Sequence, residues 1–164
     1  MIINCTYNNC NQIIKLFKKN FKKISYKQQL TEVAVIESKK YIPGITIMDG
    51  PFITIMPLVG SKKKYLLYDV ENSILKTSTN SVSKMNAKSN YFKMNSKLKK
   101  YLKNYKVKYL YSNFGYRPIP LKDFEANRST KILTLKINDL KMINILEGKY
   151  ISAPFIARNL SRKI

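Results

Sequence analysis

Few residues in this 164-residue sequence could carry out chemistry, and the missing types exclude several reactions. The chain contains no histidine, which rules out Ser-His-Asp and Cys-His nucleophile systems and zinc sites that use histidine. Cys5 and Cys10 are the two cysteines, and two thiolates cannot complete a four-thiolate site. We therefore expect no metal site and interpret both cysteines as reduced structural thiols.

The glycines are too widely spaced to form a phosphate-binding loop. They stand at positions 44, 50, 60, 115 and 148, and no group of them matches G-x-G-x-x-G or a P-loop. A cofactor phosphate would need a segment outside these residues, or a site of another kind.

The closing stretch "LEGKYISAPFIARNLSRKI" has the pattern of a strand, a glycine and a helix start. Gly148 follows an apolar strand over 141–146, Ser152 can cap a helix, and Pro154 is tolerated in a first helical turn. One helix face is marked at every fourth residue by Ile156, Leu160 and Ile164. The free N–H groups at this helix start could contact an anion or cofactor. Alternatively, Gly148 ends a strand and the helix covers a sheet.

The net charge of +22 raises the possibility of nucleic-acid binding. Arginine, which makes bidentate contacts to phosphate and guanine, occurs at four positions, and lysine supplies the remaining positive charge. Lysine, asparagine and isoleucine are abundant together, which indicates a broad compositional bias instead of a dedicated binder. No apolar run approaches the length of a membrane span, so we expect a cytoplasmic protein.

The first residues predict a β-α unit. "MIINCTY" is apolar on both faces, as expected for a strand in the middle of a parallel sheet whose other strands are missing here. Asn8 or Asn9 can cap the following helix. One face of that helix is predicted to contain Ile13, Ile14, Phe17 and Phe21.

From Gln28 onward the apolar period changes to two, which predicts an antiparallel sheet. Its four strands are expected in "QLTEVAVIES", "GITIMDG", "PFITIMP" and "KKYLLYDVE". A loop over 72–90 and a basic helix over 91–105, with Leu98 and Leu102 inward, follow. "VKYLYSNFGYRPIPL" predicts a strand that enters an extended loop, and "TKILTLKINDLKMINIL" predicts a hairpin that turns at residues 138–139.

Several stretches together resemble FAD-dependent oxidoreductases of the D-amino-acid oxidase type. They are, in order, "INCTY", "GITIMDGPFITIMPLVGSKKKYLLYDV", "ANRSTKI" and "ILEGKYISAPFIARNL". The resemblance implies the C-terminal part of such an enzyme, without the N-terminal Gly-rich β-α-β unit that holds the FAD pyrophosphate in that family. It implies an α+β fold in which residues 1–25 and 107–164 are the remnant of a Rossmann-like FAD-binding domain. Residues 26–106 would then be an antiparallel substrate lobe with the basic helix.

The same resemblance implies roles for individual residues. Asn4 and Thr6 match a segment beside FAD, where the family usually has glycine in place of Tyr7. Arg128 matches an Arg-Pro-Thr element near the flavin, with Ser129 at the proline position. The segment that runs along the flavin ring matches Gly148, Lys149, Tyr150 and Ile151.

The family reaction moves hydride from a carbon bearing an amine or hydroxyl to the flavin. In this chain Arg117 is the candidate for binding a substrate carboxylate, because its N–H donors form a matching fork; the alternative is an arginine that anchors the "GYRPIP" loop. We expect the chain to bind FAD together with an N-terminal FAD-binding segment or subunit, and to be inactive alone. The alternatives are a Lys-rich nucleic-acid-binding module and a non-catalytic scaffold subunit.

Overall fold

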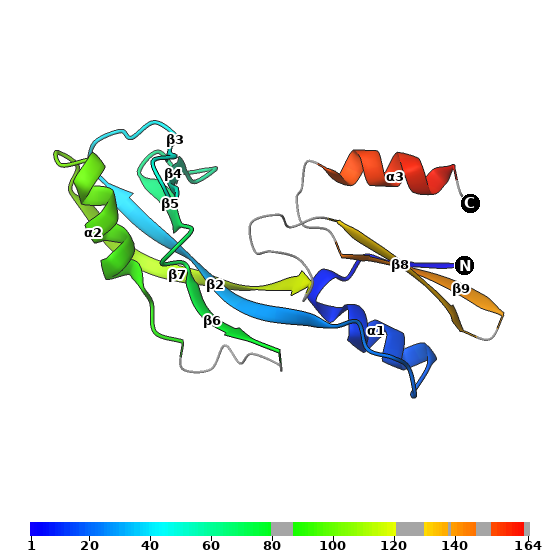
Figure 1. Ribbon diagram of the computed structural model, residues 1–164. Helices are drawn as coiled ribbons and strands as arrows, with labels where there is room; N and C mark the ends of the chain where they lie inside the picture. Colours follow the sequence, from blue (N-terminus) through cyan, green and yellow to red (C-terminus); the bar gives the residue numbers. More distant parts are fainter. Residues whose placement is uncertain (80–86, 121–129, 138, 147–151, 163–164) are drawn as a thin grey trace. The chain divides into compact units, whose positions relative to one another are not determined.

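The computed structural model describes residues 1–79, 87–120, 130–137, 139–146 and 152–162. The chain divides into two compact units. The terminal unit consists of residues 1–28 and 117–164, and the central unit consists of residues 29–116. The chain passes between the units within two long strands, β2 and β7 (Figure 1).

The terminal unit joins the two ends of the chain in one sheet with the order β1-β9-β8. Strand β1 is parallel to β9, with Ile2 opposite Met142 and Asn4 opposite Asn144, and β8 forms an antiparallel hairpin with β9. Its elements are β1 (Ile2–Asn4), the 3-10 helix η1 (Tyr7–Asn9), α1 (Cys10–Phe17), β8 (Lys131–Ile137), β9 (Leu140–Leu146) and α3 (Ala153–Ser161).

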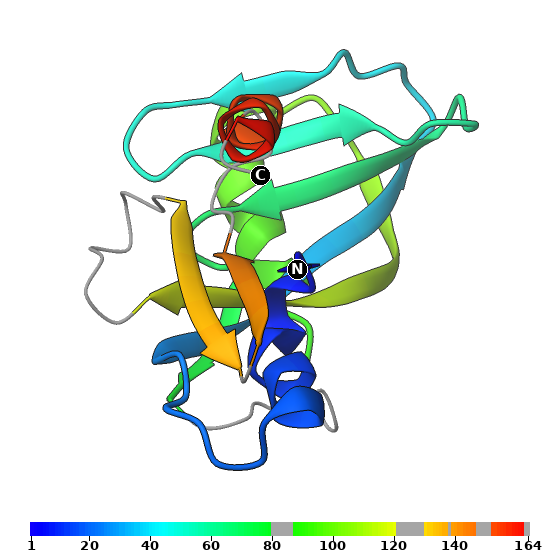
Figure 2. The ribbon, with the colours of Figure 1, turned by 90° about the vertical axis from the view of Figure 1, so that its right-hand side faces the viewer.

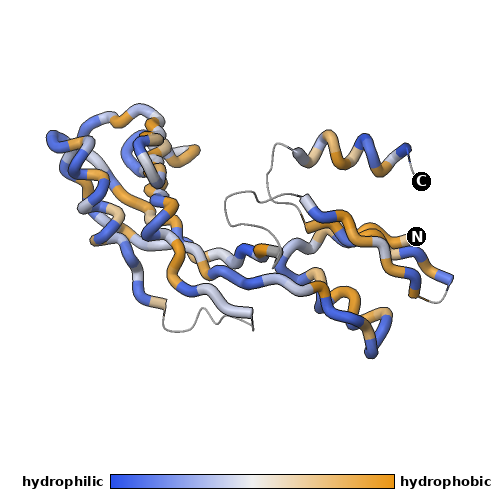
Figure 3. Tube along the Cα trace, viewed as in Figure 1, coloured by the Kyte–Doolittle hydropathy of each residue, from blue (hydrophilic) through white to orange (hydrophobic). Residues whose placement is uncertain are grey.

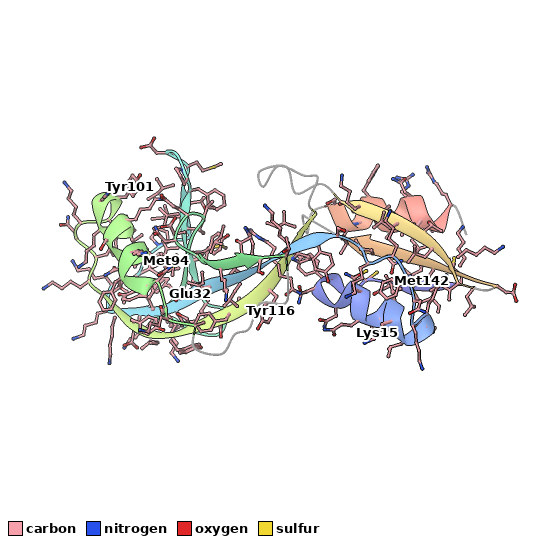
Figure 4. The ribbon with its side chains drawn as sticks, turned by 60° about the horizontal axis from the view of Figure 1, so that its bottom comes forward. Lys15, Glu32, Met94, Tyr101, Tyr116 and Met142 are labelled. Carbon is pink, nitrogen blue, oxygen red and sulfur yellow. The ribbon has the colours of Figure 1, made fainter. Side chains whose placement is uncertain are left out.

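The two helices of the terminal unit lie on opposite faces of this sheet (Figures 1 and 2). Met142 packs with Ile14 of α1, whereas Ile143, the next residue of β9, packs with Ile156 of α3. Successive strand residues point to opposite faces, so this alternation creates a three-layer arrangement. Figure 4 shows Met142 toward α1, with Lys15 on the outer side of that helix.

The central unit is built on a sheet with the order β3-β4-β5-β2-β6, and β7 also pairs with β2. The pairs β3 with β4, β4 with β5, and β2 with β5 are antiparallel. Its elements are β2 (Tyr26–Ser38), β3 (Ile45–Ile47), β4 (Ile53–Pro57), β5 (Lys64–Asp69), β6 (Ile74–Ser78), α2 (Tyr91–Tyr101) and β7 (Val107–Pro120).

One continuous core holds the central unit together. Buried residues of β2, β4 and β5 pack with Tyr91, Met94 and Leu98 on one face of α2. Figure 3 shows hydrophilic residues between these apolar positions of α2, and Figure 4 shows Met94 on the side of the helix that faces the sheet. The helix therefore presents a lysine-rich face on its other side.

The α+β class and the four antiparallel strand segments predicted from the sequence are confirmed. The hairpin is also confirmed, with Ile137 opposite Leu140. The loop expected over 72–90 is wrong in its first part, because Ile74–Ser78 forms β6 beside β2. Pairing with a central strand outweighs the weak local preference of this Ser- and Thr-containing segment.

Three other boundaries differ from the sequence prediction. Helix α1 ends at Phe17, which is 45% exposed, because the backbone becomes extended at Lys18; Phe21 then packs against the core from outside the helix. Helix α2 ends at Tyr101 instead of residue 105. Strand β7 continues to Pro120 where an extended loop was predicted, because its pairing with β2 supplies partners for its backbone.

Among the described residues, no helix is both long and apolar enough to span a membrane.

Candidate functional site: the carboxyl ends of two parallel strands

A buried polar network fixes the chain at the point where β1 ends. The Asn4 side chain is 2% exposed, and its Nδ2 donates hydrogen bonds to the Cys10 carbonyl oxygen at 3.1 Å and to Asn144 Oδ1 at 2.8 Å. Asn4 Oδ1 accepts hydrogen bonds from the backbone N–H and the hydroxyl of Thr6, at 3.2 and 2.7 Å. One amide thus joins β1, β9 and the start of α1, and it sets the direction in which the chain leaves the sheet.

Cys10 is part of the same network. Its thiol is fully buried and donates to Asn144 Oδ1 at 3.5 Å. Burial, and to a smaller extent the nearby Cys5 thiol, raises the pKa of Cys10 from 9.0 to about 11. Cys10 is therefore a protonated, inert thiol at neutral pH, whereas Cys5 is exposed. Both cysteines are free, as the sequence predicted.

Tyr7 adopts a backbone conformation that favours glycine. Its φ is +51°, the one positive φ at a non-glycine residue of the described chain. A left-handed conformation costs an ordinary residue about 1–2 kcal/mol, so the surrounding hydrogen bonds must stabilise it. The turn follows directly from Thr6, whose hydrogen bonds to Asn4 hold the preceding residues in place.

An apolar hollow of about 420 Å³ lies between the sheet and α3. Cys5 and Tyr7, which follow β1, line it together with Ile145 of β9 and with Ala153 and Ile156 of α3. The remaining lining residues are Ile3, Ala157, Leu160 and Ser161. The hollow therefore lies beside the carboxyl-terminal ends of the parallel strands β1 and β9.

The position of the hollow in the sheet topology is one where α/β proteins bind ligands. Strands β1 and β9 are parallel neighbours, and the helices that follow them, α1 and α3, cover opposite faces of the sheet. In open α/β sheets, such a reversal leaves a crevice at the carboxyl ends of the strands, where ligands bind. The hollow is therefore the candidate ligand site of the terminal unit.

The residues that the sequence assigned to a cofactor fall into two groups. Asn4 and Thr6 lie at the edge of the site. The Asn4 side chain forms hydrogen bonds to other protein groups, and Thr6 is exposed. Asn4 thus shapes the turn instead of presenting its amide to the hollow. The other assigned residues, Arg128, Gly148, Lys149, Tyr150 and Ile151, lie outside the described residues.

Arg117, the candidate for a substrate carboxylate, lies in β7 and is half-buried. It is not one of the residues that line the apolar hollow. The lining residues Ile3, Tyr7 and Ile145 lie within the stretches that carry the resemblance, but none of the three was assigned a binding role from the sequence. The small and apolar helix start "SAPFIA" was the available signal, because small residues at a helix start leave space beside a sheet.

Two buried acidic groups of the central unit, Glu32 and Asp69, serve internal contacts. The fully buried carboxylate of Glu32 accepts hydrogen bonds from the hydroxyls of Ser89 and Ser112 and from the N–H of Asn90, the last at 2.7 Å. Asp69 accepts from Lys97 Nζ at 3.0 Å. Among the described residues, no group of three or more metal-ligating side chains occurs.

The chain was also compared with known proteins. No protein-family model and no curated protein sequence matches it. The geometry of the hollow and the sequence pattern around it are therefore the basis for a functional proposal.

Proposed function

We propose that these residues form part of an FAD-dependent oxidoreductase of the D-amino-acid oxidase type. The terminal unit would provide one wall of the flavin site, and the central unit would be the substrate lobe. The observation that carries the proposal is the apolar hollow at the carboxyl ends of two parallel strands whose helices lie on opposite faces. Tyr7 adds support, because its φ of +51° occurs where the resembling family has glycine.

The residues of the hollow fit one part of the cofactor. Its lining is mostly aliphatic, with Tyr7 as an aromatic member, which suits a planar ring such as the isoalloxazine. Within the described part of the chain, no lysine or arginine lines it and no Gly-rich turn occurs. The hollow therefore suits the ring and not the pyrophosphate, which requires close backbone approach and a helix N-terminus.

A bound flavin would supply the hydride acceptor, which this chain's own side chains cannot provide. The chain itself would orient the ring and exclude water from one side of it through Ile145 and Ile156. Arg117 is proposed to bind a substrate carboxylate through its fork of N–H donors.

Because the hollow does not suit the pyrophosphate, the proposed partner must supply the phosphate site. Strand β1 is at the edge of its sheet, so the described residues provide no strand on its outer side. A Gly-rich β-α-β unit could continue the parallel sheet at this edge, since unpaired strand edges readily accept another strand. We propose that this unit, as a preceding segment or a separate subunit, holds the pyrophosphate.

The experiment is a flavin-retention measurement with and without that unit. The chain is mixed with FAD and dialysed at about 0.15 M salt, where loose electrostatic attraction is screened. We expect no stoichiometric flavin absorbance from residues 1–164 alone, and we expect retention when a Gly-rich β-α-β unit of this enzyme type is joined before Met1. Retention by the chain alone would contradict the placement of the phosphate site, and no retention by the joined protein would contradict the proposed function.

A further inference from the structure

The central unit carries a second surface that the flavin proposal does not use. We propose that the outer face of α2, continued by the start of β7, binds single-stranded nucleic acid without sequence preference. This inference is independent of the flavin site, because it rests on other residues and another unit.

The first part of the surface is a hollow of about 470 Å³ along α2. Phe92 and Tyr101 line it together with Lys93, Lys97 and Lys100, residues whose spacing places them on one side of the helix. The Phe92 side chain is 81% exposed and Tyr101 is 39% exposed. Exposed aromatic rings beside lysines are the combination on which nucleic-acid bases stack while the lysines attract the phosphates.

The charge of this first hollow is positive despite the nearby Glu71. Lys97 donates to Asp69 at 3.0 Å and to Glu71 at 3.4 Å. Desolvation opposes the charge of Lys97, but its hydrogen bonds and charge interactions with the two carboxylates dominate and raise its pKa. Lys93 and Lys100 form no ion pair within the described part of the chain, so their charges are available to a ligand.

The second part is a hollow of about 550 Å³ near the first. It is lined by Lys39 and Lys40, which follow β2, by Lys106, which precedes β7, and by Lys108, the second residue of β7. Among the described residues, Glu37 is its one acidic member. Asn104 of this hollow is three residues from Tyr101 of the first, so their Cα atoms are at most about 11 Å apart. The two hollows are thus close along the chain, and the proposal is that a single strand of several nucleotides contacts both.

The residue types also determine which nucleic acid fits. Residues 29–116 contain no arginine, the side chain that reads guanine through paired hydrogen bonds. Lysine and aromatic rings recognise phosphates and base faces, which every single strand presents and which a duplex keeps stacked inside. The surface is thus suited to a single strand, with little dependence on its sequence.

The test measures the fluorescence anisotropy of a short labelled oligothymidylate at several salt concentrations. Phe92→Ala combined with Tyr101→Ala is compared with Phe155→Ala, which removes an exposed ring from α3. Stacking contributes about 1–3 kcal/mol per base, which corresponds to a five-fold or larger loss of affinity for each ring. We expect that loss for the α2 variant, no loss for Phe155→Ala, and weaker binding of a duplex of equal length.

A second pair of variants separates this surface from the general positive field of the chain. Lys39→Glu with Lys106→Glu is compared with Lys62→Glu with Lys63→Glu, an equal charge change at two exposed lysines outside both hollows. The first pair should lower the salt dependence of binding by about 0.7 for each phosphate that the protein no longer neutralises. The proposal would be overturned if both lysine pairs lost the same binding affinity and salt dependence. It would also be overturned if removal of the two α2 rings left the affinity unchanged.

Discussion

The two units of this protein are stabilised in different ways. The central unit has one continuous apolar core in which Ala34, Ile36 and Leu67 are fully buried. The terminal unit has two smaller clusters, one on each face of a three-stranded sheet, and a buried hydrogen-bond network joins its strands. Among the described residues, the proposed flavin site therefore belongs to the unit with the smaller apolar clusters. Ligand sites commonly lie in the less stable parts of a fold. The comparison is therefore consistent with a site that an additional segment completes.

The largest expected effect concerns the core of the central unit. Leu67→Ala removes a fully buried side chain from the centre of the sheet, and such changes cost about 3–5 kcal/mol. We expect the free energy of unfolding measured in urea to fall by this amount. Hydrogen exchange should accelerate in β2, β4 and β5. Faster exchange confined to β1 and β9 would contradict the assignment of this core to the central unit.

The next effect concerns the polar network of the terminal unit. Asn4→Ala removes the Nδ2 donor from Asn144 Oδ1, which keeps the weak Cys10 thiol donor at 3.5 Å, and removes one donor from the Cys10 carbonyl, at a cost of about 2 kcal/mol. Asn20→Ala, at an exposed position, is the matched control and should change stability by less than about 0.5 kcal/mol. Exchange should accelerate in β1, β9 and α1. If the two variants unfold at the same urea concentration, the network does not stabilise the unit.

Alkaline pH should weaken the terminal unit through Cys10. Its pKa is about 11 in the folded protein and 9.0 in an unfolded chain, so the folded state keeps the proton more tightly. This contribution is complete below pH 9 and is lost as the pH rises toward 11. Urea unfolding at several pH values should show the decline in the wild type and a smaller one in Cys10→Ala. An identical pH dependence in both proteins would refute it.

The smallest effect concerns Tyr7. Both Tyr7→Gly and Tyr7→Ala remove the ring, but alanine keeps the cost of a φ of +51° and glycine does not. We expect the glycine variant to be more stable than the alanine variant by about 1 kcal/mol in thermal unfolding. A more stable alanine variant would show that this turn does not require the left-handed conformation.

Local patterns predicted most of the elements, and long-range pairing decided the rest. The alternating residues of 29–71 and the hairpin at 138–139 were predictable because strand period and turn chemistry are encoded locally. Strand β6 was missed because its stability depends on β2, about forty residues earlier in the chain.

The segments that form the candidate site were predictable from the sequence, but the roles of individual residues in it were not. The motif after β1 and the helix start at Ala153 were both singled out from the sequence. The role of Asn4 was not, because an asparagine in an apolar strand could equally face a ligand or a buried partner. Its partner, Asn144, lies 140 residues away. The left-handed φ of Tyr7 was also hidden, since tyrosine rarely marks such a turn.

The most direct test of the proposed flavin site uses riboflavin, which carries the ring without the pyrophosphate. Cys5 is exposed and lines the hollow, so its alkylation by iodoacetamide, followed by mass spectrometry, reports whether the hollow is occupied. Ala157→Phe fills the hollow, and Arg158→Phe adds the same ring to α3 outside it. We predict that riboflavin slows alkylation of Cys5 in the wild type and in Arg158→Phe, but not in Ala157→Phe. An unchanged rate in the wild type, or equal protection in Ala157→Phe, would contradict the assignment of the hollow to the flavin ring.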